Sequence, residues 1–118
     1  MITTFETAKL AKEKGFDLIC QYYYEILDNP VTLQKMPNSN AEGYIQPSAP
    51  DQSELQTWLR NKGVMVEVTF YTCDDGIEYS VEVCHEKTWD TKSEFTKDTF
   101  KSYEKALERG LQEGLKLL

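Results

Sequence analysis

The sequence predicts an α+β fold formed by a single domain that spans residues 1–118, in which an antiparallel sheet is packed by three helices. Two observations support this prediction. Residues 64–85 alternate apolar and polar side chains on two arms that flank an Asp-Gly turn, as in an antiparallel hairpin. Three other segments carry apolar residues at helical spacing. A length of 118 residues also fits one domain.

The first predicted helix covers residues 4–14. Thr3 and Glu6 have the spacing of a capping box, in which their side chains satisfy backbone donors of the first turn. Gly15 suits the left-handed conformation that ends many helices. The apolar stripe of this helix consists of Phe5, Ala8 and Ala11.

Residues 18–27 are rich in aromatic and branched side chains, which favour a strand. Asp28-Asn29-Pro30 is a turn signal, and residues 31–35 are expected to return as a short partner strand. The composition then shifts to Pro, Asn, Ser and Gly, which predicts a loop that is mobile over residues 37–48.

The middle helix is predicted over residues 50–62, and a C-terminal helix is predicted to follow the hairpin. In the C-terminal helix Ala106, Gly110 and Gly114 form a row of small residues, which predicts close approach of its backbone to another element. A third strand is expected around Phe95. The predicted core combines the inward residues of these elements: Leu55, Trp58, Leu59, Val66, Val68, Phe70, Tyr79, Val81, Tyr103, Leu107 and Leu111.

The charge balance argues against several classes of protein. Thirteen Lys and Arg against 20 Asp and Glu give a net charge of −7, and such a chain repels the phosphates of a nucleic acid. The cysteines, Cys20, Cys73 and Cys84, form no CxxC pair, so the sequence predicts neither a zinc site nor a disulfide framework. We expect no cofactor and no metal. The absence of a signal-like or membrane-spanning apolar run predicts a cytoplasmic protein that does not bind membranes.

Catalytic candidates are few, and we predict that the protein is not an enzyme. His85 is the only histidine, and its neighbour Cys84 points to the opposite face of a strand, so the two cannot form a dyad. Glu67, Glu78 and Glu82 share one face of the hairpin. They could serve as paired carboxylates or hold a cation, but a solvated polar face is the more ordinary explanation.

The function predicted from the sequence is a non-catalytic module that binds a protein partner or a second copy of itself. Aromatic residues are its expected contacts: Tyr44 and Trp89, which no sheet face requires, and Tyr22 and Tyr24 as exposed candidates of the first predicted strand. The alternative is a nucleic-acid-associated accessory protein of a mobile element. That alternative would use a basic patch formed by Lys9, Lys12, Lys14, Arg60 and Lys62.

Three blocks of the chain carry a resemblance to a known group of proteins. They are TFETAKLAKEKGFD at residues 4–17, APDQSELQTWLR followed by VMVEV at residues 49–68, and SYEKALERGLQEGLKLL at residues 102–118. In these blocks the chain resembles a family of small uncharacterised proteins from Bacteroides-type gut bacteria and their prophages. The resemblance implies a bacterial or prophage origin, and it implies no activity, cofactor or catalytic residue.

Overall fold

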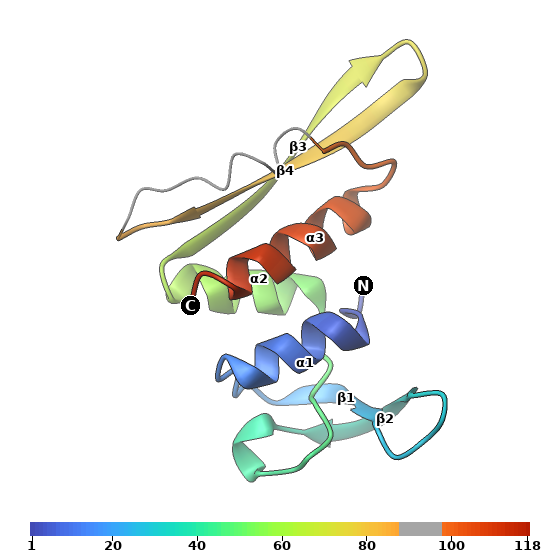
Figure 1. Cartoon of the computed structure of the whole chain (residues 1–118), viewed down its shortest axis with the longest axis vertical. Coiled ribbons are helices and arrows are strands. Elements are labelled where there is room, and N and C mark those ends of the chain that lie inside the picture. Colours follow the sequence, from blue (N-terminus) through green and yellow to red (C-terminus); the bar gives the residue numbers. More distant parts are fainter. Residues whose placement is uncertain (88–97) are drawn as a thin grey trace. The chain divides into compact units, whose positions relative to one another are not determined.

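A computed structural model gives the structure of the chain and describes residues 1–87 and 98–118 (Figure 1). Within it the chain separates into two compact units, Met1–Glu54 and Leu55–Leu118. Helices and antiparallel strands occur in both units, so the predicted α+β class is confirmed.

The N-terminal unit contains one helix and a two-stranded antiparallel sheet. Helix α1 spans Phe5–Glu13, and strands β1 and β2 span Cys20–Glu25 and Thr32–Asn38. The predicted small hairpin is therefore confirmed. Helix α1 lies over one face of this sheet (Figure 1), where the Phe5 ring meets the Tyr24 ring edge-on at 5.6 Å between centroids.

The ends of α1 show one confirmed prediction and one wrong one. Gly15 has a φ of 92°, and Phe16 N–H donates to Ala11 O at 2.9 Å, so the chain leaves the helix as predicted. The N-cap is Thr4, not Thr3: its side chain accepts from Thr7 N–H. The Thr3 hydroxyl instead donates to Pro50 O at 3.0 Å, because residues 1–3 run beside residues 50–52.

The segment after β2 forms a 3-10 helix, η1, at Asn40–Glu42 and then returns along the free edge of β1. Tyr24 N–H donates to Pro47 O, and Ala49 N–H donates to Tyr22 O, both at 2.9 Å. These bonds make residues 47–49 a short third member of the sheet. Strand β2 continues to Asn38, so the predicted loop over residues 37–48 begins two residues too early. The expected mobility of this segment stays a prediction.

The C-terminal unit consists of a long hairpin with a helix across its base (Figure 1). Strands β3 and β4 span Val64–Cys73 and Gly76–His85, and helix α3 spans Tyr103–Leu115. Helix α2, Gln52–Asn61, enters this unit at Leu55. The register pairs Val66 with Val83 and Val68 with Val81 without a shift, as the predicted hairpin requires.

The row of small residues on α3 lies against β3 and β4. A Cβ atom built on Gly110 would lie 2.5 Å from Val81 Cγ2 and 2.7 Å from Val66 Cγ1. At Gly114 the nearest atoms, from Val66, Val64 and Leu59, would be 3.1–3.3 Å away. The predicted close approach is confirmed, and it explains two glycines inside a helix despite their unfavourable propensity.

The predicted core is correct at the base of the hairpin and wrong toward its tip. Seven of its members are buried: Leu55, Trp58, Leu59, Val66, Val81, Leu107 and Leu111. Val68 and Tyr79 are half-buried, whereas Phe70 is 69% exposed and Tyr103 is 43% exposed. The reason is length: ten residues of β3 extend about 33 Å, but thirteen residues of α3 cover only about 20 Å.

The third strand expected around Phe95 lies outside the described residues. Just after that gap, Phe100 forms an isolated antiparallel bridge with Tyr79 on the outer edge of β4. Ser102 then caps α3 by accepting from Lys105 N–H at 3.1 Å.

Candidate functional site: an apolar groove in the N-terminal unit

A groove of about 600 Å³ lies in the N-terminal unit. Helix α1 and the residues just after it form one wall of the groove, and residues 40–47 form the other. The volume of the groove lies in the range of common small-molecule pockets. Most of its lining is apolar. The lining residues are Phe5, Lys9, Lys12, Glu13, Gly15, Phe16, Asp17, Ile26, Asn40, Ala41, Ile45 and Pro47.

The apolar lining has a buried part and an open part. Phe16 and Pro47 are buried, and Phe5 is half-buried. Ile26 and Ile45 remain 37% and 59% exposed. These two isoleucines are the lining side chains that could lose most apolar surface to a bound partner.

Side-chain hydrogen bonds fix the two walls of the groove relative to each other. Asn40 Nδ2 donates to Phe16 O at 2.9 Å, and Ser39 Oγ donates to Asp17 O at 2.7 Å. Asn40 Oδ1 also accepts from Ser48 N–H at 3.0 Å. The segment that carries Ile45 is thus tied to the end of α1, so the groove is preformed.

The buried side chain of Asn38 also holds the backbone near the groove in place. Its Nδ2 donates to Tyr22 O at 2.8 Å and to Met36 O at 2.7 Å, and its Oδ1 accepts from the Ser48 hydroxyl. A buried amide with satisfied donors and acceptor favours one backbone arrangement over its alternatives.

Charges of both signs line the groove. Lys9 and Glu13 are exposed on α1, and Asp17 is exposed just beyond it. Lys12 Nζ donates to Tyr44 O at 2.5 Å, a further link between the two walls. The groove therefore offers both cationic and anionic contacts around its apolar lining.

The predicted aromatic contacts that the structure describes, Tyr22, Tyr24 and Tyr44, are not among the lining residues of this groove. Tyr44 is 51% exposed, and its side chain lines a separate hollow of about 250 Å³ with Tyr23 and Met36 among its neighbours. Tyr22 is half-buried, as is Tyr24, whose hydroxyl donates to Thr3 O at 2.5 Å. Trp89 lies outside the described residues.

The predicted basic patch is divided between the units. Lys9, Lys12 and Lys14 belong to α1 and the residue after it, whereas Arg60 and Lys62 belong to the C-terminal unit. Lys62 Nζ lies 5.4 Å from the centroid of the Trp58 ring, a cation–π contact. The five-residue patch stays a prediction.

Each glutamate of the predicted acidic face lies beside another side chain of the C-terminal unit. Glu67 pairs directly with Glu82, and both are exposed, as a solvated polar face predicts. Glu78 accepts from Lys101 Nζ at 2.7 Å and from the Tyr71 hydroxyl at 3.2 Å. Hydrogen bonds from Lys101, then from Thr99 and Tyr71, hold the pKa of Glu78 below its usual value.

Cys84 directly precedes His85 at the end of β4, where the Cys84 thiol donates to the His85 backbone oxygen at 3.8 Å. Burial, with the nearby charge of Glu54 as a smaller cause, raises the pKa of the Cys20 thiol to about 12, which leaves it unreactive at neutral pH. Cys73 is exposed near the hairpin turn, and His85 ends β4. Among residues 1–87 and 98–118, no cluster of three or more acidic, cysteine or histidine side chains could hold a metal ion.

Sequence reasoning missed the groove residues Ile26, Ile45 and Phe16. Phe16 follows the glycine that ends α1, which hints that it folds back onto the helix. No sequence signal shows that residues 26 and 45, distant along the chain, line one groove.

Comparisons of the chain with protein-family models, with curated proteins and with solved structures find no match. The resemblance to the Bacteroides and prophage family therefore stays a prediction. Within the described part of the chain, no helix has both the length and the apolar character needed to cross a membrane.

Proposed function

We propose that the protein is a non-catalytic interaction module whose groove along α1 binds a short apolar peptide segment of a protein partner. The observation that carries this proposal is the pair of exposed isoleucines, Ile26 and Ile45, beside buried Phe16 in a preformed groove. Apolar side chains that converge in a groove of this size are typical of binding sites.

The groove chemistry favours binding over catalysis and peptide over nucleic acid. The described residues that line it include no serine, cysteine or histidine, so they offer no nucleophile paired with a histidine base. Glu13 and Asp17 accompany Lys9 and Lys12, which suits a partner with charges of both signs better than a polyanion.

A displayed library of random peptides, selected on the whole chain, tests the proposal. We expect enriched peptides with apolar anchors, and we expect Ile45→Asp to weaken their binding about tenfold or more, measured by fluorescence polarisation. Leu27→Asp is the matched control, because Leu27 is 75% exposed and lies outside the groove. It should change affinity less than about twofold.

Two outcomes would contradict the proposal: no enriched peptide, or equal losses in both variants. The second candidate, a nucleic-acid-associated protein, rests on Lys9 and Lys12 of α1 and on Lys14, which directly follows that helix. Retention of duplex or single-stranded nucleic acid at about 200 mM salt, weakened by Lys9→Glu, would favour that candidate instead.

A further inference from the structure

Among the residues that the structure describes, none pairs with the outer half of β3 along its edge away from β4. Near the base, Gln56 Nε2 donates to Val66 O at 2.7 Å and covers the edge there. On the other edge, Tyr79 and Phe100 exchange two backbone hydrogen bonds of 2.9 Å. Between Val68 and Thr72, no described residue outside the hairpin hydrogen-bonds to the β3 backbone.

The backbone groups on this edge point outward. In an antiparallel pair, residues alternate between those that bond across the pair and those whose N–H and C=O face away. Tyr79 uses its N–H and C=O for Phe100, so its partner in the register, Phe70, also directs these groups away from β4. Two residues to either side, Val68 and Thr72 do the same.

This edge has no feature that discourages pairing with another strand. Residues 68–72 read Val-Thr-Phe-Tyr-Thr, all strong strand formers, with no charge, proline or glycine. The register continues through them without a bulge. Edges that stay unpaired are usually protected by lysine, proline or a bulge.

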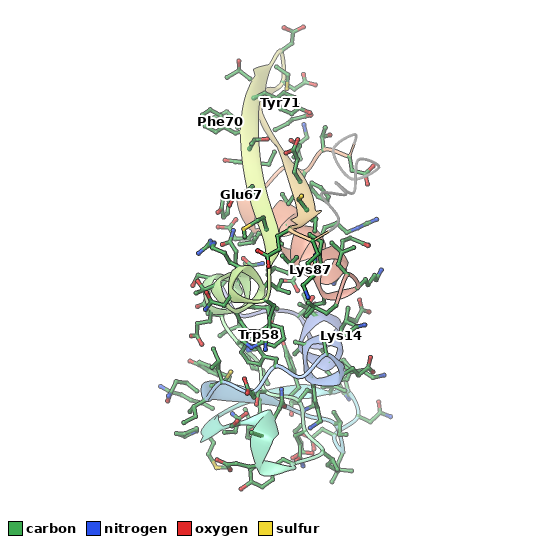
Figure 2. The ribbon with its side chains drawn as sticks, turned by 90° about the vertical axis from the view of Figure 1, so that its left-hand side faces the viewer. Lys14, Trp58, Glu67, Phe70, Tyr71 and Lys87 are labelled. Atoms are coloured by element: carbon green, nitrogen blue, oxygen red, sulfur yellow. The ribbon has the colours of Figure 1, made fainter. Side chains whose placement is uncertain are left out.

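A large apolar side chain is also uncovered beside the edge. Phe70 lies near the tip of the hairpin (Figure 2) and is 69% exposed. Its neighbour across the hairpin, Tyr79, meets Tyr103 edge-on at 6.2 Å, which marks the end of the cover that α3 provides.

We propose that a second copy of this chain pairs with this edge, β3 against β3, antiparallel about a two-fold axis at Phe70, to form a four-stranded sheet. In this register Phe70 lies beside its own counterpart, and Val68 lies opposite Thr72 of the other copy. Glu67 lies opposite Cys73, so no two carboxylates oppose each other directly. The segment is therefore self-complementary. This inference concerns the C-terminal unit and goes beyond the proposed peptide groove.

The net charge of the chain gives this contact a distinctive salt dependence. Two copies at −7 each repel one another, and salt screens that repulsion. Self-association should therefore strengthen as salt rises from about 20 to about 300 mM. Binding to a nucleic acid would weaken over the same range.

Sedimentation equilibrium of the whole chain tests the pairing. We expect the mass to rise with concentration from 13.7 kDa toward twice that value. Thr72→Pro removes an outward N–H and leaves the β3–β4 bonds intact, so it should weaken association about tenfold or more. The matched control is Ile77→Pro, because Ile77 lies directly opposite on β4 and faces the other edge. It should leave association within about twofold of the unchanged chain.

A second pair of variants serves if proline prevents folding. Phe70→Lys should abolish association, whereas Ile77→Lys, at a 51% exposed residue on the same face of β4, should retain it.

A monomer up to about 500 µM at about 300 mM salt would overturn the proposal. So would equal effects at positions 72 and 77 or at positions 70 and 77. Binding of an added strand peptide by a chain that stays monomeric would assign the edge to a foreign partner and also overturn it.

Discussion

The base and the tip of the β3–β4 hairpin share one alternation of apolar and polar residues but differ in their surroundings. At the base, Val66 is 2% exposed and Val81 is fully buried beneath α3. At the tip, Phe70 and Ile77 are 69% and 51% exposed on the same face of the hairpin. Alternation therefore identifies a face of a strand, and a second element decides whether that face is buried.

The largest expected effect is the loss of a core side chain at the base. Leu107 on α3 is 3% exposed. Leu107→Ala should lower the free energy of unfolding by about 2–5 kcal/mol, because it removes buried apolar surface and leaves a cavity. Urea denaturation measures the change. A loss below about 0.5 kcal/mol would show that this face of α3 is not in the core.

A smaller loss is expected where the α3 backbone approaches the sheet. Gly→Ala inside a helix ordinarily stabilises by about 1 kcal/mol. At Gly110 the new methyl group would lie 2.5 Å from Val81 Cγ2, so Gly110→Ala should instead destabilise by about 1–3 kcal/mol.

Gly114→Ala is the control for this change, because its closest contact would be 3.1 Å and the neighbouring side chains can shift. Thermal unfolding compares the two variants. Equal or greater stability of Gly110→Ala would contradict the close packing of α3 on the hairpin.

The smallest effect is expected at the tip. Phe70→Ala should change the free energy of unfolding by less than about 0.5 kcal/mol, because the ring is largely in solvent. Urea denaturation at low micromolar concentration, which disfavours self-association, checks this value. A loss above about 2 kcal/mol would mean that the ring is covered within a single chain.

The groove shows how much of the candidate site the sequence could reveal. Lys9 and Lys12 were expected only as part of the alternative basic patch for nucleic acid, which stays a prediction, and both line the groove. Ile26 and Ile45 were not expected, because they lie far apart in the chain and line one groove only in the folded N-terminal unit. Contacts between residues so far apart in the chain leave no periodic signal.

The sequence by itself determined the elements and their faces: the helix that Gly15 ends, the two hairpins, and the row of small residues at Gly110 and Gly114. These features depend on side chains a few positions apart, whose spacing reflects the geometry of a helix or a strand. The tertiary structure alone decided which half of the hairpin is covered, how Asn38 is satisfied and where an apolar groove stays open. Those outcomes depend on the relative lengths and positions of whole elements, which local periodicity does not encode.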